Sequence, residues 1–237
     1  MMDVGEEQKV DIVELSLLTH DLAAQHAFYT RTLGVPLVGD TPASFAVQAG
    51  ATRLVFAETA RAAPPYHIAF NIPRTALPAA KHWLTSRAPL LARDGRDEFA
   101  FASWDARSVY FRDPAGNIVE FIARQALPDD AGDASGAFGP HDLRCVSEIG
   151  LPVDDVPARA ADLIARLGVA PYKEQSDAFA PLGDEHGLFI VVRVGRPWLP
   201  TDDVYAAATP VRVVIRGARE QVYHILGLPY DIEMTRG

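Results

Sequence analysis

Two stretches of this chain repeat each other at a constant spacing, and this repeat limits the possible folds more than any other feature. The segment ELSLLTHDL at 14–22 aligns without a gap with EIGLPVDDV at 148–156. The same offset of 134 residues places Leu33-Gly34-Val35 on Leu167-Gly168-Val169. One offset that holds over about 40 residues indicates an internal duplication. Both halves should therefore have the same order of secondary structure.

Each copy begins with a strand in which apolar and polar residues alternate. Alternation places Val13, Leu15 and Leu17 on one face of the first strand. Glu14 lies on the opposite face. The elements expected next are a helix over about 22–33 that ends at Gly34, and strands over about 43–49 and 52–58, with a further strand if the chain bends near Gly39–Asp40. This order is βαβββ.

The same order recurs more faintly within each half. The pattern predicts a strand at 66–73, a helix at 75–87, and strands in FAFASW (99–104), SVYF (108–111) and NIVEFIA (117–123). The second half starts again with a strand at 209–217 and a helix at about 218–226. It then ends at Gly237, which leaves no length for the closing strands. This last unit is expected to be incomplete.

A change of composition separates the two copies. Residues 126–142 are rich in Ala, Asp, Gly and Pro and have no periodicity, which is typical of a linker. We therefore expect a complete domain over 1–125, a linker over 126–144, and a second, truncated domain over 145–237.

Composition excludes several classes of protein. The net charge of −9 argues against a nucleic-acid or anionic-membrane partner, because both select basic surfaces. Cys145 is the single cysteine, which rules out an intrachain disulfide and a cysteine zinc site. The charged start has no signal-peptide core, and no apolar run approaches the roughly 20 residues of a membrane helix. A cytoplasmic protein is expected.

Glu120 is a carboxylate inside an apolar strand, IVEF, and needs a partner there. Strand parity places Glu14, His67 and Glu120 each on the face opposite the larger apolar residues. If their strands curve round one cleft, two carboxylates and an imidazole form an open divalent-cation site. The alternatives are that Glu14 is salt-bridged at the surface, that His67 is an ordinary structural histidine, and that Glu120 pairs with Arg112 or Arg107.

These motifs resemble a known group of proteins. The segments at 21–34, YHIAF at 66–70 and YFRDPAGNIVEF at 110–121 are similar to the vicinal oxygen chelate superfamily, which includes glyoxalase I, extradiol dioxygenases and bleomycin-resistance proteins. The resemblance implies an α+β fold in which tandem βαβββ modules form a curved mixed sheet around a cleft. It implies metal ligands at Glu14, His67 and Glu120, where Glu14 replaces the usual histidine. Glu58 has the wrong parity for a fourth ligand.

The resemblance also suggests catalytic residues. Glu14 or Glu120 would move a proton, as in glyoxalase-type isomerisation. Tyr110 precedes Glu120 by ten residues, as a tyrosine does in extradiol dioxygenases, although a half-buried strand tyrosine is the alternative. Ring cleavage is disfavoured, because Glu14 stands where a histidine is needed and AETARAAPPY at 57–66 contains no histidine.

The second copy is expected to lack a metal site. It keeps Glu148 at the position of Glu14, but it has Arg212 where His67 would recur, and no counterpart of Glu120 is expected. The segment Asp184-Glu185-His186 is expected to be an exposed hairpin tip. Because the truncated half would leave an open sheet edge, we expect a homodimer or cover from the linker.

The function expected from these features is that of a divalent-metal-dependent enzyme acting on a small oxygen-chelating substrate. The cation would be Zn, Ni, Mn or Fe, and the chemistry that of a lyase, an isomerase or a related enzyme. The alternative is a metal-free protein that binds or sequesters a small molecule, in the manner of bleomycin-resistance proteins.

Overall fold

The structure is a computed structural model and describes residues 10–129 and 137–236. Its elements form four successive modules. The first contains β1 (Asp11–Thr19), α1 (Leu22–Ala27) with a π-helical turn (Phe28–Thr32), β2 (Leu37–Thr41), β3 (Ser44–Ala49) and β4 (Thr52–Glu58). The second contains β5 (His67–Ile72), α2 (Leu77–Thr85), β6 (Phe99–Phe101), a 3-10 turn (Ala102–Trp104), β7 (Ala106–Arg112) and β8 (Ile118–Arg124). The third, after a 3-10 turn (Pro140–Asp142), contains β9 (Cys145–Val153), α3 (Val156–Leu167), β10 (Phe179–Gly183) and β11 (Leu188–Arg193), and the fourth contains β12 (Val211–Gly217), β13 (Gln221–His224) and β14 (Tyr230–Arg236).

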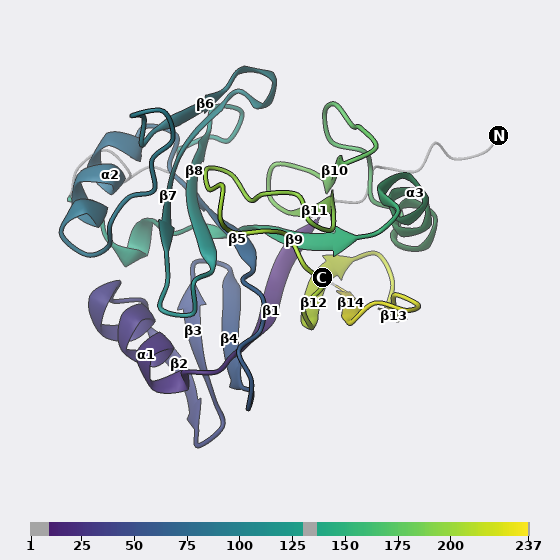
Figure 1. The fold of residues 1–237 in the computed structure, drawn as a ribbon, viewed down its shortest axis with the longest axis horizontal. Coiled ribbons are helices and arrows are strands. Elements are labelled where there is room, and N and C mark those ends of the chain that lie inside the picture. Colours follow the sequence, from purple (N-terminus) through teal and green to yellow (C-terminus); the bar gives the residue numbers. More distant parts are fainter. Residues whose placement is uncertain (1–9, 130–136, 237) are drawn as a thin grey trace.

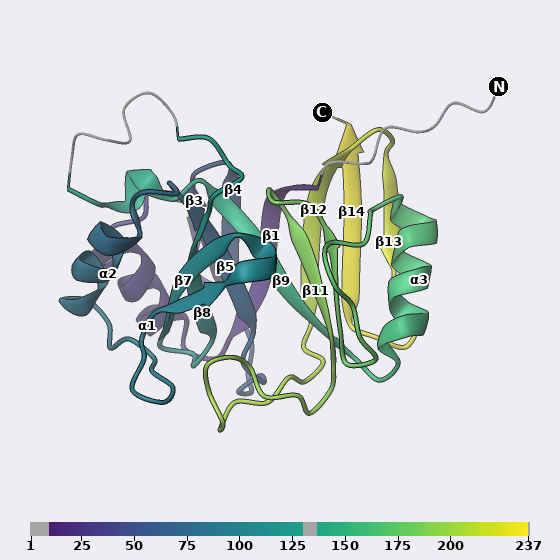
Figure 2. The ribbon, with the colours of Figure 1, turned by 90° about the horizontal axis from the view of Figure 1, so that it is seen from above.

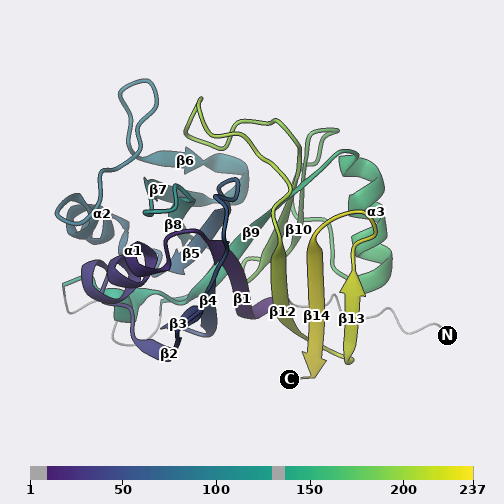
Figure 3. The ribbon, with the colours of Figure 1, turned by 60° about the horizontal axis from the view of Figure 1, so that its bottom comes forward.

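The strands form two mixed sheets, and each sheet combines one module from either half of the chain (Figure 1). Sheet A has the order β13-β14-β12-β1-β4-β3-β2, and its strands lie across the lower part of Figure 3. Sheet B has the order β10-β11-β9-β5-β8-β7-β6. The expected α+β fold of repeated modules in curved mixed sheets is confirmed.

Two antiparallel strand pairs join the halves. β1 pairs with β12 in sheet A, and β5 pairs with β9 in sheet B. Within each module the first strand instead lies parallel to the last, as β5 does to β8 and β12 does to β14. The stretches 1–125 and 145–237 that the sequence suggests as domains therefore share both sheets.

The fourth module is incomplete in a different way from the one expected. The helix predicted at 218–226 is wrong, because Gln221–His224 is the edge strand β13 and pairs antiparallel with β14. β14 is a closing strand, so the prediction that the chain ends without one is also wrong. Tyr223 hydrogen-bonds Asp162 of α3 and faces the Arg166 guanidinium, so packing on α3 overrides local helix propensity. Within the described residues, this module lacks the helix and one of the four strands of a βαβββ unit.

A bulge near the start of β1 changes the parity read from the sequence. The register with β12 shifts between Ile12 and Glu14, and Ile12 rather than Val13 is buried beside Leu15 and Leu17. β9 has the same irregularity against β5, just before Glu148. The duplication therefore extends to the bulge, which the period of two in a strand cannot reveal.

The main apolar core contains residues from both sheets, α2 and α3, and Leu22 of α1 packs against it. Figure 2 shows α1 and α2 beside the strands of the first half and α3 at the other end of the molecule, next to β13. Ile68, Phe70, Phe121 and Ile149 belong to this core and occupy one face of the central strands of sheet B. Their neighbours in sequence therefore point to the opposite face.

The linker region only partly belongs to the described structure. Residues 130–136 lie outside it, whereas Phe138 is buried against Trp83 and Phe121. The premise for a homodimer, a missing closing strand, is removed by β14 and β13. None of the described helices is long and apolar enough to span a membrane.

Gly50 joins the sheets closely and provides a test of this architecture. Its φ is +56°, and a Cβ there would lie 2.0 Å from the Arg144 carbonyl oxygen at the start of β9. Gly95 has a similar φ of +73° with no atom within 4 Å of such a Cβ. We expect Gly95→Ala to lower the free energy of unfolding by about 1 kcal/mol through backbone strain, and Gly50→Ala by about 3 kcal/mol or more through strain and the clash.

Chemical denaturation of the two variants measures both values. Equal losses would mean that the hairpin at Gly50 does not contact the β9 backbone as closely as the structure shows.

Candidate metal centre

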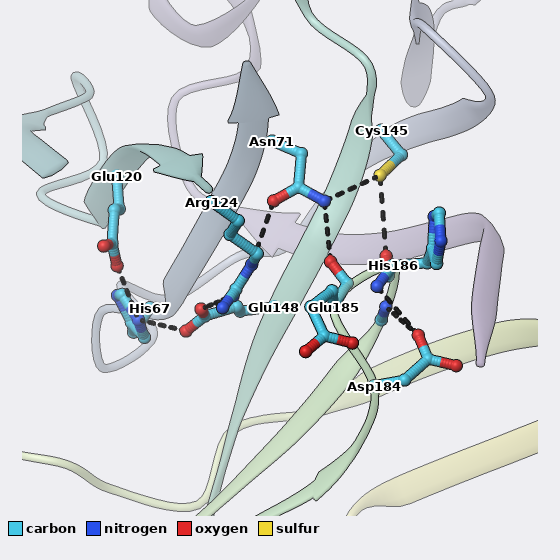
Figure 4. A network of polar contacts seen from close by, with 10 residues as sticks. His67, Asn71, Glu120, Arg124, Cys145, Glu148, Asp184, Glu185 and His186 are labelled. Carbon is cyan, nitrogen blue, oxygen red and sulfur yellow. Dashed lines mark hydrogen bonds and ion pairs between the residues drawn. The ribbon is translucent and has the colours of Figure 1, made fainter. Parts of the chain in front are cut away.

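Three adjacent strands at the middle of sheet B place acidic and imidazole side chains together. His67 is at the start of β5, Glu120 is on β8, and Glu148 is on β9. Since their neighbours Ile68, Phe121 and Ile149 face the core, these polar residues project to the other face. Figure 4 shows both carboxylates turned toward the imidazole.

The distances within this cluster fit a metal ion. His67 Nε2 lies 3.6 Å from Glu120 Oε2 and 3.6 Å from Glu148 Oε2. One ligand atom from each residue lies within 4.8 Å of the other two. Ligands bound at about 2.0–2.2 Å in tetrahedral geometry stand about 3.3–3.6 Å apart. The three residues therefore fit a divalent cation with little movement.

Burial and mutual charge perturb the cluster. Burial and the charge of Glu148 raise the pKa of Glu120 to about 7, against the opposing effect of His67. Burial alone would lower the pKa of His67, but Glu148 and Glu120 outweigh it, so this pKa lies above 6.5. Two buried carboxylates close together favour any added positive charge, whether a proton or a metal ion.

A buried arginine orients Glu148. Arg124, on the same face of β8 as Glu120, is 1% exposed and forms an ion pair with Glu148 Oε1. Its Nε donates to Asn71 Oδ1 at 3.1 Å, and the Asn71 amide donates to the Glu185 carbonyl at 2.8 Å. This chain, visible in Figure 4, leaves Glu148 Oε2 directed at His67. Such support from outer residues is usual around metal ligands.

The segment expected as an exposed hairpin tip is part of this network. Asp184, Glu185 and His186 are only half exposed. Asp184 accepts from the His186 and Gly187 amides, which fixes the turn whose Glu185 carbonyl receives Asn71. The tip therefore helps to hold Arg124 in place through Asn71.

Glu14 does not join this cluster. It lies on β1 in sheet A, where it accepts hydrogen bonds from Arg53 at 2.7 Å and from Arg212. The surface salt bridge weighed from the sequence is the arrangement observed. Arg112 and Arg107, the alternative partners of Glu120, instead pair with Asp203 and Glu98.

Sheet A has an arginine where sheet B has the imidazole. In the parallel strand pair of sheet B, His67 lies opposite the residue two positions before Glu120, and in that of sheet A, Arg212 lies opposite the residue two positions before Glu233. Arg212 and Glu233 are therefore at the positions equivalent to His67 and Glu120. Glu14 and Glu148 are also equivalent by the 134-residue repeat. Arg212 bonds to Glu14 and, at 2.6 Å, to Glu233, so a guanidinium bridges the two carboxylates of sheet A.

A small, mostly apolar cavity of about 190 Å³ opens beside the cluster. Its walls combine the polar cluster with aromatic and aliphatic side chains: His67, Phe101, Trp104, Tyr110, Glu120, Ile122, Glu148, Phe179, Ile190, Arg196, Trp198 and Leu199. Such a pocket with a few convergent polar groups is typical of a small-molecule site.

Tyr110 lies directly across from Glu120 in the β7–β8 pair and faces this cavity. It is 3% exposed, and its ring centroid lies 6.4 Å from that of His67. Burial, with the charge of Glu120, raises the pKa of its hydroxyl well above 10. The hydroxyl therefore keeps its proton at neutral pH.

Trp198 comes from the connection between β11 and β12 and covers His67. Their ring centroids are 5.1 Å apart. The indole lies so close to Gly150 of β9 that a Cβ there would be 2.5 Å from it. The absence of a side chain at Gly150 therefore makes room for the indole that covers the site.

The structure brings His67 and Glu120 together, as the sequence suggested, and it adds Glu148, Arg124 and Trp198, which were not predicted from the sequence. The signal for Glu148 was its match to Glu14 in the repeat. Nothing in local periodicity shows that β9 rather than β1 lies beside β5. Arg124 and Glu120 are separated by an even number of positions in the same strand, so strand alternation places both side chains on the same face.

No protein-family model matches the sequence, and no curated protein matches it. Solved structures do match its fold. A putative dioxygenase from Bacillus subtilis subsp. subtilis str. 168 aligns over 97% of this chain and 86% of its own, with 16% identity and a TM-score of 0.61. Glyoxalase I from Zea mays aligns over 97% of this chain and 93% of its own, with 14% identity and a TM-score of 0.57. At these identities the similarity establishes the fold alone: the chain has a glyoxalase-type fold.

Proposed function

We propose that this protein is a divalent-metal-dependent enzyme that acts on a small molecule with neighbouring oxygen atoms. The observation that carries the proposal is the convergence of His67, Glu120 and Glu148 at the wall of the cavity. These three residues would hold the cation, with Glu148 in the place that the sequence suggested for Glu14. One imidazole and two carboxylates suit Zn, Ni, Mn or Fe.

When bound, the cation would supply Lewis acidity toward substrate oxygens. The chain's own residues would do the rest. Tyr110 remains protonated and can donate a hydrogen bond to a substrate oxygen in the cavity. Glu120 would be able to take up and return a proton only when released from the cation, because its pKa is raised to about 7 by burial and Glu148 in the metal-free cluster. Trp198 and the other aromatic walls exclude water from the reacting atoms.

A second function, metal-free binding of a small molecule, is favoured by one observation. Arg124 already supplies a buried positive charge to Glu148, and His67 supplies another when protonated. The cluster can therefore be close to neutral without a metal. In that case the cavity would hold a ligand by hydrogen bonds and apolar contacts alone.

Metal titration separates the two functions. We expect the wild type to bind one divalent cation, and Glu120→Gln and Glu148→Gln to weaken binding at least about 100-fold, because each removes a charged ligand. Glu14→Gln is the matched control, since Glu14 is the counterpart of Glu148 in sheet A. It should bind metal like the wild type.

Calorimetry with Zn²⁺, Ni²⁺ and Mn²⁺, together with elemental analysis of the purified protein, measures these affinities. If the wild type takes up no cation at millimolar concentrations, the binding-protein function is the better account. If Glu14→Gln loses metal as Glu120→Gln does, the site has been assigned to the wrong sheet.

The metal-free protein should become less stable as the pH rises. The pKa of Glu120 is raised from 4.5 to about 7 and that of His67 is raised above 6.5, so the folded state holds protons that the unfolded chain releases. Their stabilising contribution is complete at low pH and is lost as the pH passes through the raised values, between about pH 5 and pH 8.

Thermal unfolding in the presence of a chelator measures this dependence. Glu120→Gln should flatten it, whereas Glu14→Gln should leave the wild-type slope unchanged. If the stability of the wild type rises with pH more steeply than that of Glu120→Gln, the raised pKa values assigned to Glu120 and His67 are contradicted.

A further inference from the structure

The cavity contains one charged residue besides the proposed metal ligands. Arg196 lines it, on the connection from β11 to β12 that also supplies Trp198 and Leu199. The other walls are aromatic or aliphatic, apart from Tyr110. A charged side chain in such a setting suggests a functional role, because partly desolvating a charge costs free energy.

No carboxylate in the described part of the chain pairs with Arg196. Other arginines of the chain are paired: Arg93 with Asp202, Arg112 with Asp203 and Arg107 with Glu98. The Arg196 guanidinium carbon instead lies 5.0 Å from the centroid of the Phe179 ring. Its partial burial lowers the pKa of this guanidinium from its ordinary value. The N–H donors of the Arg196 guanidinium therefore have no acidic partner in the described part of the chain.

The backbone holds this arginine in a fixed place. The Arg196 amide donates to the Arg193 carbonyl at 3.1 Å, and its own carbonyl accepts from the Ala206 amide at 2.8 Å. Pro197 and Tyr205 form an isolated bridge across the same loop. A ligand would therefore meet a guanidinium whose loop is already ordered.

We infer that the substrate carries a carboxylate on an apolar body, and that Arg196 binds this carboxylate. The inference rests on the proposed function in one respect, since it places the reacting oxygens of the substrate at His67, Glu120 and Glu148. A guanidinium matches the two oxygens of a carboxylate with two parallel hydrogen bonds. The apolar body would lie against the rings of Phe179 and Trp104.

Charge supports this assignment. The chain has a net charge of −9, and two carboxylates of the cluster line the cavity, so a local positive group favours the binding of an anion there. Arg196 is that group, and it gives the cavity two different ends. One end is acidic and suited to a cation and the oxygens that chelate it, while the other is basic.

The test compares small carboxylates with their primary amides, which have the same shape without the charge. Benzoate, phenylacetate and hexanoate are titrated against benzamide, phenylacetamide and hexanamide, with the fluorescence of Trp104 and Trp198 or calorimetry as the readout. In chelator, at least one carboxylate should bind about tenfold or more tightly than its amide. Arg196→Gln should abolish this preference, and Arg196→Lys should keep only part of it.

Arg193→Gln is the matched control. Arg193 lies three residues before Arg196 and carries the same charge, but its side chain is exposed and does not line the cavity. This variant should keep the wild-type preference. A panel in which no carboxylate exceeds its amide, or an Arg196→Gln variant that keeps the preference, would overturn the inference. Because these titrations are made without metal, they can fail while metal binding succeeds, and they can succeed while metal binding fails.

Discussion

The antiparallel pairing of β5 with β9 is the contact on which the site depends. It joins the second and third modules into one sheet, and it brings Glu148 within 3.6 Å of His67. The bulge just before Glu148 sets which face this carboxylate takes. Both strands also carry core residues on their other face. Burial of these apolar residues fixes the register of the two strands, and it therefore keeps together polar groups that would otherwise repel each other.

The same framework balances its paired carboxylates in two ways. In sheet A, Arg212 lies between Glu14 and Glu233, and a permanent guanidinium charge completes the group. In sheet B, His67 stands at the equivalent position, and an imidazole can lose its proton. Only the second arrangement leaves room for a change of charge. The two sheets of this repeated fold thus differ at equivalent positions, because sheet A has a salt-bridged arginine and sheet B has a titratable imidazole between two carboxylates.

Much of this could be predicted from the sequence, and the reasons for the failures are specific. The repeat at 134 residues indicated the modules, because it is visible in the residues themselves, and alternation along each strand placed His67 and Glu120 on the faces opposite the larger apolar residues, because it is a local pattern. Glu148 was missed because strand partners are chosen by long-range packing, which one sequence does not display. β13 was missed because its contacts with α3 outweigh the helix propensity of its own residues. Arg196 and Trp198 were missed because they lie on a loop without a periodic pattern.

The division of each sheet between the two halves has a consequence for assembly. The range 10–129 carries His67, Glu120 and Arg124, while the range 137–236 carries Glu148 and Arg196. Neither range contains a whole site. If the halves were expressed as separate polypeptides, the cavity would exist only in their complex, so ligand uptake would report complementation. The site is in this sense an interface within a single chain, and its affinity for a ligand is linked to the association of the two halves.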